Sequence, residues 1–201
     1  MQIMPGVWKL SFGTPEAGAP SKQRYVKAPL KKALSELPAV EAPFSLESVK
    51  FSVSSRGVLL ELPLSEKEDL YGLGLQLKSY RQTGKKKSLR VNSDPVADTG
   101  DSHAPAPLYF STAGYGILVD TARYANFYCG GAKKVSGKSK EQSLKFRQGT
   151  VFTEAELYAA NKSSSSPVYV DIPAAQGIDI FIFAGPTMLD AVRRYVLFSG
   201  G

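Results

Sequence analysis

The sequence predicts an all-β fold, an antiparallel β-sandwich followed by one C-terminal helix. Short segments in which apolar and polar residues alternate recur along the chain, and turn-forming residues separate them. Only the last segment has a helical period. A chain of 201 residues, 43% of them hydrophobic, is long and apolar enough to bury a core without disulfides or metal ions.

The first elements follow from this alternation. Trp8, Leu10 and Phe12 fall on one face of a strand. Five prolines in 13–46 exclude a long regular element there and leave at most a short helical turn at 31–37. The segments 49–53 and 58–62 alternate around a turn at 55–57 and predict a hairpin.

The remaining strands are shorter and are bounded by Gly, Pro, Ser or Asp. We predict them at 70–77, 88–91, 108–111, 115–120, 125–129, 143–147, 151–158, 168–172 and 178–184.

The helix is predicted from Thr187 to Phe198. Thr187 can cap its first turn together with Asp190, and the apolar residues Met188, Leu189, Val192, Tyr195 and Val196 have helical spacing. We therefore divide the chain into a sandwich at 1–186 and a helix at 187–201 that leads toward a further part of a longer protein.

Composition excludes several classes of protein. One cysteine and one histidine cannot form a disulfide framework or the usual zinc site, so neither a metal nor a cofactor is expected. The net charge of +7 lies in short lysine runs near Gly and Ser, which is typical of solvated loops rather than of a nucleic-acid surface. No apolar run approaches the ~20 residues of a membrane helix. The segment 1–6 lacks the features of a signal peptide, and the compartment stays open between cytoplasm and periplasm.

Familiar catalytic motifs are missing. Gly72-Leu73-Gly74 resembles the start of a dinucleotide fingerprint, but Leu77 stands where the third glycine should be, so a strand bulge is the better interpretation. There is no Gly-x-Ser-x-Gly elbow. Cys129 ends an apolar strand and is interpreted as a packed hydrophobic residue.

The segment 92–103 is the most polar part of the chain. It contains Asp94, Asp98, Asp101 and His103 and few apolar residues, between two predicted strands. Such residues fold back on their own backbone in turns, and they also suit the hydroxyl groups of a sugar. The composition of the loop leaves both interpretations open.

Four pieces of sequence at and around this loop form a recognisable pattern. They are, in order, Asp69-Leu70-Tyr71-Gly72-Leu73-Gly74, Asn92-Ser93-Asp94, Pro107 to Ser111 with Gly114 to Asp120, and Ala184-Gly185-Pro186-Thr187 with Asp190 and Tyr195. In these pieces the chain resembles the amino-terminal domain of glycoside hydrolase family 31, which comprises α-glucosidases, α-xylosidases and α-galactosidases, and the likeness covers about 47–201. Leu75 replaces an acidic residue of the family pattern, and Ala104 to Pro107 also departs from it, which leaves the sugar open.

The resemblance implies a galactose mutarotase-like sandwich that covers a catalytic (β/α)₈ barrel. In this family both catalytic aspartates lie in that barrel, so this chain is expected to contain no catalytic residue. The loop at 92–103 would reach the substrate of the full-length enzyme, with Asp94 at the position of the family motif and Asp98 and Asp101 as further substrate-binding candidates. His103 would form a hydrogen bond where the loop ends. The implied partners are the barrel and a carbohydrate. Because a sandwich that covers a barrel keeps its covering surface when the barrel is absent, we expect an exposed apolar patch that includes Leu189, Val192 and Val196, and self-association of the isolated chain into a homo-oligomer.

Two other interpretations remain. A free-standing carbohydrate-binding module would present aromatic side chains, and Tyr124, Phe127 and Tyr128 are the obvious group. On one strand, however, Tyr124 and Tyr128 share a face and Phe127 lies on the other. A structural or protein-binding sandwich would use the basic surface as its contact.

Overall fold

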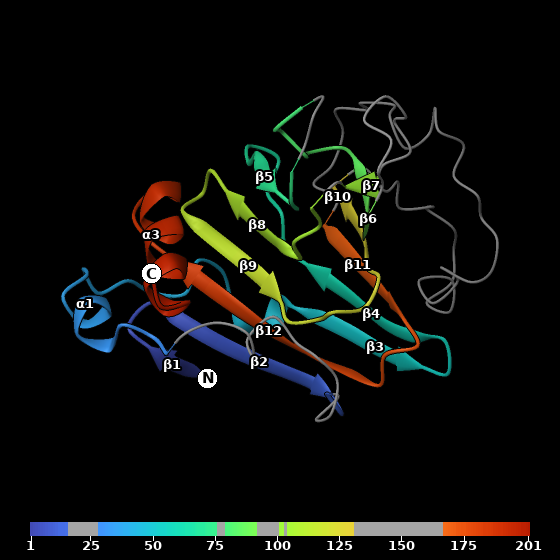
Figure 1. Cartoon of the computed structure of the whole chain (residues 1–201), viewed down its shortest axis with the longest axis horizontal. Coiled ribbons are helices and arrows are strands. Elements are labelled where there is room, and N and C mark those ends of the chain that lie inside the picture. Colours follow the sequence, from blue (N-terminus) through green and yellow to red (C-terminus); the bar gives the residue numbers. More distant parts are fainter. Residues whose placement is uncertain (16–27, 76–78, 92–100, 103, 131–166) are drawn as a thin grey trace.

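The computed structural model describes residues 1–15, 28–75, 79–91, 101–102, 104–130 and 167–201. Two six-stranded sheets form a sandwich, with both helices at one end of the molecule (Figure 1). The predicted all-β fold with one C-terminal helix is therefore confirmed.

The first sheet has the order β1-β2-β12-β9-β8-β5 and contains the first and the last strand of the described chain. Its strands are β1 (Gln2–Met4), β2 (Val7–Gly13), β12 (Gly177–Ala184), β9 (Tyr115–Val119), β8 (Leu108–Ser111) and β5 (Leu70–Gly72). The second sheet has the order β3-β4-β11-β10-β6-β7. Its strands are β3 (Lys50–Ser54), β4 (Gly57–Leu62), β11 (Val168–Pro173), β10 (Asn126–Cys129), β6 (Lys86–Val91) and β7 (Asp101–Ser102).

The predicted strands outside 131–166 are present, with two kinds of difference. β5 is shorter than expected, because Gly72, Leu73 and Gly74 all have positive φ values (123°, 61° and 94°) that end the extended strand. The strands β1 and β7 were not expected, and β7 pairs with β6 in parallel, whereas the sequence predicted antiparallel pairing throughout. The strands predicted at 143–147 and 151–158 lie outside the described residues.

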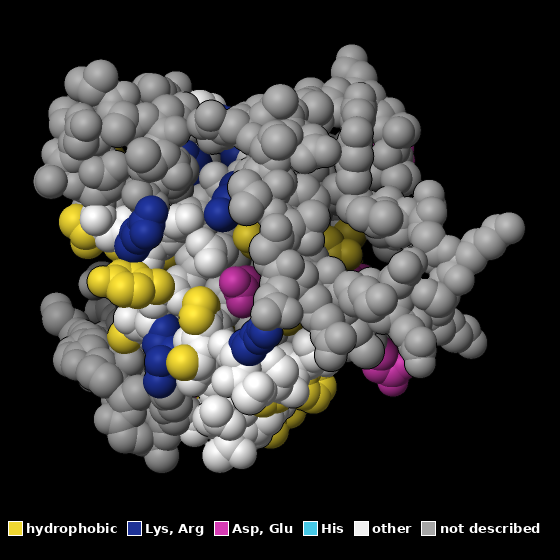
Figure 2. Space-filling view, turned by 90° about the vertical axis from the view of Figure 1, so that its right-hand side faces the viewer, with side chains coloured by type: hydrophobic (Ala, Val, Ile, Leu, Met, Phe, Trp, Pro, Cys, Tyr) yellow, Lys and Arg dark blue, Asp and Glu magenta, His cyan; other side chains and the backbone are white. Residues whose placement is uncertain are grey.

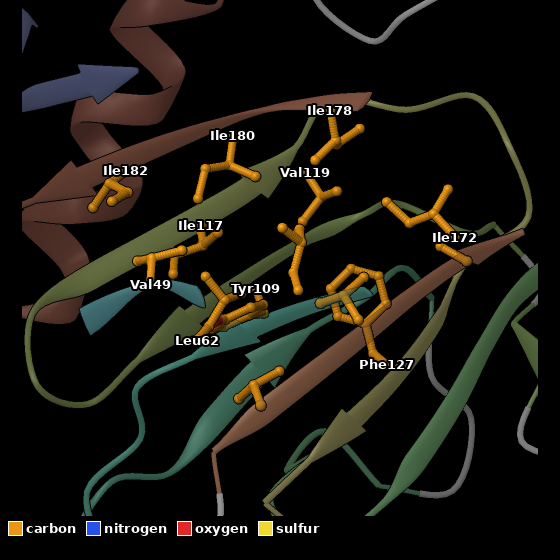
Figure 3. Packing of buried hydrophobic residues seen from close by; sticks show 14 of the residues in the cluster. Val49, Leu62, Tyr109, Ile117, Val119, Phe127, Ile172, Ile178, Ile180 and Ile182 are labelled. Carbon is orange, nitrogen blue, oxygen red and sulfur yellow. The ribbon is translucent and has the colours of Figure 1, made fainter. Parts of the chain in front are cut away.

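The main core lies between the two sheets (Figure 3). Ile178, Ile180 and Ile182 of β12 project from the first sheet into the space between the sheets, into which Ile172 of β11 and Phe127 of β10 project from the second. These side chains alternate with residues that point out of the sandwich, so a period-two sequence pattern becomes one continuous apolar layer.

A second core lies on the outer side of the first sheet. Leu118, Phe181 and Phe183 form one buried cluster with Leu34 of the short helix α1 (Lys31–Ser35) and Phe198 of α3 (Met188–Phe198). The 3₁₀ turn η2 (Leu46–Ser48) is the other regular piece between β2 and β3 in the described part of the chain. The described segment 28–48 therefore holds no long regular element, as its prolines predicted, and α1 lies within the predicted helical turn at 31–37. The 3₁₀ turn was not expected.

The C-terminal helix begins as the sequence predicted. The Thr187 hydroxyl accepts a hydrogen bond from the Asp190 amide, and the Asp190 carboxylate accepts one from the Thr187 amide, which completes a capping box. Ala191, Arg194 and Phe198 are buried against the sheet. Leu189 and Val196, by contrast, are 74% and 41% exposed.

No helix within the described residues is long and apolar enough to cross a membrane.

Candidate functional site

The described structure contains the ends of the candidate substrate loop. Asp94, Asp98 and His103 lie outside the described residues. The backbone of Asp101 is described, in β7, where it takes the position opposite Ser88 of β6. The loop therefore leaves the second sheet at the end of β6 and returns beside that same strand.

A row of polar residues crosses the second sheet at this level. Asp171 of β11 lies opposite Asn126 of β10, which lies opposite Ser88 of β6. The Ser88 hydroxyl donates to Asn126 Oδ1 at 2.9 Å, and Asn126 Nδ2 donates to Asp171 Oδ2 at 3.4 Å. Asp101 continues the row by its register position. The row joins residues up to 83 positions apart in sequence, and no local pattern could have shown it.

The segment after β5 lies against the other end of the candidate loop. The Leu73 amide donates to the Leu108 carbonyl at 2.8 Å, and the Leu75 amide donates to the Ala104 carbonyl at 3.3 Å. A Cβ atom at Gly72 would lie only 2.6 Å from the Leu108 carbonyl oxygen. The glycine motif therefore serves a close backbone approach, as the bulge interpretation predicted.

The segment 81–83 is held to β5. Arg81 forms a β-bridge with Tyr71, and its Nε lies 2.5 Å from Asp69 Oδ1. The Thr83 hydroxyl donates to the same carboxylate oxygen at 3.2 Å and accepts from the Leu70 amide at 2.9 Å. The ion pair and the hydroxyl fix the segment at the edge of the first sheet.

Glu68 holds the segment before β5 in place through hydrogen bonds. One oxygen of the Glu68 carboxylate accepts hydrogen bonds from Tyr115 Oη at 2.6 Å and from Ser111 Oγ at 2.7 Å, and the other accepts from the Ser65 amide at 3.1 Å. Burial raises the pKa of the Tyr115 hydroxyl, and its hydrogen bond to Glu68 raises that pKa further. With both oxygens bonded inside the protein, Glu68 has a structural role.

Cys129 is confirmed as a packed residue, fully buried, and burial raises the pKa of its thiol to about 12. A thiol held protonated at neutral pH is a poor nucleophile and a poor metal ligand. The described residues also contain no group of three His, Cys, Asp or Glu side chains that could hold a metal ion.

The aromatic group proposed for a binding module is not brought together. Phe127 is fully buried in the core between the sheets, Tyr128 is 9% exposed on the other face of β10, and Tyr124 is 72% exposed. Across the strands, Tyr128 lies opposite Tyr169 of β11. On the face shown in Figure 2, the described Lys and Arg side chains lie at several places among hydrophobic ones.

These features define a β-sandwich in which the residues on both sides of a polar loop are held to regular structure. Solved structures share this fold. A dextranase of glycoside hydrolase family 31 from Flavobacterium johnsoniae, a mutant complexed with isomaltotriose, matches with a TM-score of 0.52 at 14% identity. The same enzyme complexed with glucose matches with a TM-score of 0.50 at 14% identity. Both matches cover 75% of this chain and 15% of the dextranase chain.

The comparison confirms, at the level of the fold, the resemblance to family 31 enzymes. This chain spans about 15% of the length of the dextranase structures that it matches. By sequence, no protein-family model and no curated protein matches the chain.

Proposed function

We propose that this chain is the accessory β-sandwich of a longer family 31 retaining α-glycosidase, similar to the α-glucosidases. The observation that carries the proposal is the fold match, in which most of this chain corresponds to a small share of a family 31 dextranase. The four sequence pieces that resemble the family support it independently, since they lie in family order along the same chain. The catalytic carboxylates would belong to a barrel outside these residues.

The loop at 92–103 supplies the substrate contacts in this proposal. Asp94 is the first candidate, and Asp98 and Asp101 are the next. Support comes from the two ends of the loop. Its start follows β6 directly, and its end is held by the pairing of β7 with β6 and by the Leu75–Ala104 hydrogen bond. A polar loop that starts and ends on a rigid scaffold can hold carboxylates toward sugar hydroxyls.

The exposed face of α3 is the proposed contact with the barrel. Leu189 and Val196 are exposed and Val192 is half-buried. These residues are three and seven positions apart, so they share one face of the helix, and an apolar helix face is normally covered by another part of a protein. The sandwich at 1–186 would then be the accessory domain, and 187–201 the start of the connection to the barrel. In the chain studied alone, the same face should favour self-association.

The direct test is to express the complete open reading frame that contains these residues and to assay it on an α-linked glucoside and on isomalto-oligosaccharides. We expect hydrolysis with retention of the anomeric configuration by the complete product and none by residues 1–201 alone. An open reading frame that ends at Gly201 would overturn the proposal. If such a chain still binds sugar, the carbohydrate-binding module becomes the better interpretation.

A further inference from the structure

β3 differs from the strands at the other edges of the two described sheets. The edge strands are β1 and β5 in the first sheet and β3 and β7 in the second. β1 and β5 are three residues long and β7 is two, and the register shifts along the β1–β2 and β6–β7 pairs. β3 has five residues, which pair with β4 in one continuous register. Short or irregular edges resist pairing with another chain, so β3 is the edge best suited to it.

The hairpin decides which backbone groups of β3 face away from β4. Ser54 pairs with the first residue of β4 across a two-residue turn, and such a closing pair exchanges hydrogen bonds. Because the direction of these groups alternates along a strand, Ser52 and Lys50 also turn their amides and carbonyls toward β4. Phe51 and Val53 turn theirs away from it, to a side on which no described strand pairs with β3.

The side chains of Phe51 and Val53 make one face of this edge apolar. Both residues lie opposite buried core residues of β4 and therefore face the inside of the sandwich. They are nevertheless 49% and 39% exposed. The ring of Phe51 lies 4.6 Å from that of Phe12 on β2. The apolar interior of the sandwich thus reaches solvent beside β3.

The lysine of β3 does not protect this edge. A charged side chain, most often a lysine, is a common protection of an exposed edge strand. Lys50 Nζ lies 2.9 Å from Oε1 of Glu61 on β4, so its charge is paired within its own sheet. Ser52 and Ser54, on the same face of β3 as Lys50, are small and neutral. A second strand can therefore approach without burying an uncompensated charge.

We propose that β3 is a dimerisation edge, at which two copies of this chain pair their β3 strands antiparallel with Ser52 on the two-fold axis. In this register Phe51 of each copy lies opposite Val53 of the other, so the residues with outward backbone groups meet in hydrogen-bonded pairs. An aromatic side chain opposite a β-branched one is a favourable cross-strand pair. Lys50 of each copy lies opposite Ser54 of the other, so no like charges face each other.

The backbone pattern favours this register over its neighbours. A shift by one residue would set outward groups of one strand against inward groups of the other. A shift by two residues would leave one of the two outward residues without a partner in the other β3 strand. The inference rests on β3 alone and not on the proposed function, and it concerns a different surface from the exposed face of α3.

The experiment measures the monomer–dimer equilibrium of the 201-residue chain by sedimentation equilibrium. The parent and all variants carry Leu189→Glu and Val196→Glu, which place charges on the exposed face of α3 and prevent association through it. One pair of strands buries far less than the ~800 Å² a side of a standard interface, so we expect a Kd between about 10 μM and 1 mM. A parent that stays monomeric up to about 1 mM would overturn the inference.

Charges at position 52 test the register. Ser52→Asp and Ser52→Lys each set like charges opposite each other at the two-fold axis, so each should weaken the dimer about fivefold at low salt. An equimolar mixture of the two variants sets unlike charges there and should dimerise more tightly than either variant alone. Single variants that dimerise like the parent, or a mixture no tighter than its components, would contradict the proposed edge.

Ser48 supplies the matched control for these charges. It is exposed and lies in η2, outside β3. Ser48→Asp and Ser48→Lys change the net charge by the same amounts, and alone or mixed they should dimerise like the parent.

Val53→Pro tests the backbone pairing. Because the Val53 amide faces away from β4, proline there removes a donor of the edge and no hydrogen bond of the hairpin. We expect the dimer to be lost, whereas Val53→Ile, which keeps the amide and the β-branched side chain, should dimerise like the parent. Thermal unfolding shows whether each variant keeps the fold. A folded Val53→Pro chain with an unchanged Kd would overturn the inference.

Discussion

The two sheets of this sandwich are built from different kinds of strand. In the first sheet, all of β9 and seven of the eight residues of β12 are buried. In the second sheet, β11 alternates strictly between buried and half-buried positions up to its last residue, and β4 alternates over its last four. The difference arises because α3 contacts β12, β9 and β8 from outside, whereas the outer side of β11 carries Tyr169 and Asp171.

The outer faces of the two sheets differ in what they carry. Under α3, the first sheet has a second apolar core in which Phe183 lies 5.4 Å from the ring of Tyr195 and 5.3 Å from that of Phe198. The second sheet instead carries the polar row from Asp171 through Asn126 to Ser88, which ends at the candidate loop. Stability should therefore depend on the outer face of the first sheet, and far less on the outer face of the second.

The largest expected effect is from Phe183→Ala, compared with Leu59→Ala on the outer side of the second sheet. Phe183 is fully buried under α3, so its loss should lower the free energy of unfolding by about 3–5 kcal/mol. Leu59, which is half-buried opposite Asp171, should cost about 1 kcal/mol or less. Chemical denaturation measures both, and similar losses would contradict the contrast between the two faces.

Arg194→Met should have the next largest effect. The buried Arg194 guanidinium donates from Nη1 to the Ala184 carbonyl and from Nη2 to the Pro38 carbonyl, and thereby ties α3 to the end of β12 and to the segment after α1. The variant loses two hydrogen bonds from a charged donor, each worth about 1.5–3 kcal/mol, but it also loses the cost of burying that charge, which offsets part of the effect. The free energy of unfolding should therefore fall by about 2–3 kcal/mol. Burial lowers the pKa of Arg194, and nearby Asp190 opposes that shift.

Arg193→Met is the control for this variant. Arg193 is the neighbouring residue on α3 and is exposed, so its replacement should change the free energy of unfolding by less than about 0.5 kcal/mol. Equal losses for the two variants in urea denaturation would show that the Arg194 hydrogen bonds do not hold the helix.

Alkaline pH should weaken the fold through Cys129 on the inner side of the second sheet. Its folded pKa is raised from 9.0 to about 12, chiefly by burial, while Lys85 and Lys87 lower it. The folded thiol keeps its proton, so the stability contribution is complete below pH 9 and is lost as pH rises from 9 toward 12. At pH 10 the loss should be about 1.4 kcal/mol. The unfolding free energy of Cys129→Ala should fall less steeply between pH 8 and pH 10, and parallel curves would contradict this assignment.

The smallest expected effect concerns the outer edge of the second sheet. Lys50 Nζ lies 2.9 Å from Glu61 Oε1, and the two side chains are 68% and 27% exposed. Glu61→Gln should therefore change the free energy of unfolding by about 0.2–1 kcal/mol, and the difference should shrink in high salt. A loss above 2 kcal/mol that persists in high salt would mean that this face is more important to the fold than its exposure indicates.

The sequence predicted most of the described strands, because strand alternation and turn residues are local signals. It also predicted the capping box, since Thr187 and Asp190 are three residues apart. It could not predict β7, which is two residues long and pairs in parallel, or the shortening of β5, which depends on the contact between Gly72 and Leu108. The polar row depends on pairings between distant segments, which no local pattern records.

The candidate aspartates depended on the resemblance, because polar loop residues have no periodicity. Asp94 and Asp98 lie outside the described residues, so their role stays a prediction.

The most direct test of the proposed function is the kcat/KM of the complete gene product with Asp94→Ala, on its preferred α-glycoside. One charge-assisted hydrogen bond to a sugar is worth about 1.5–3 kcal/mol, so kcat/KM should fall about ten- to a hundredfold while the free energy of unfolding stays nearly unchanged. Asp98→Ala and Asp101→Ala should have smaller effects. If all three variants keep kcat/KM within about twofold of the unchanged enzyme, the loop does not contact substrate and the central claim is wrong.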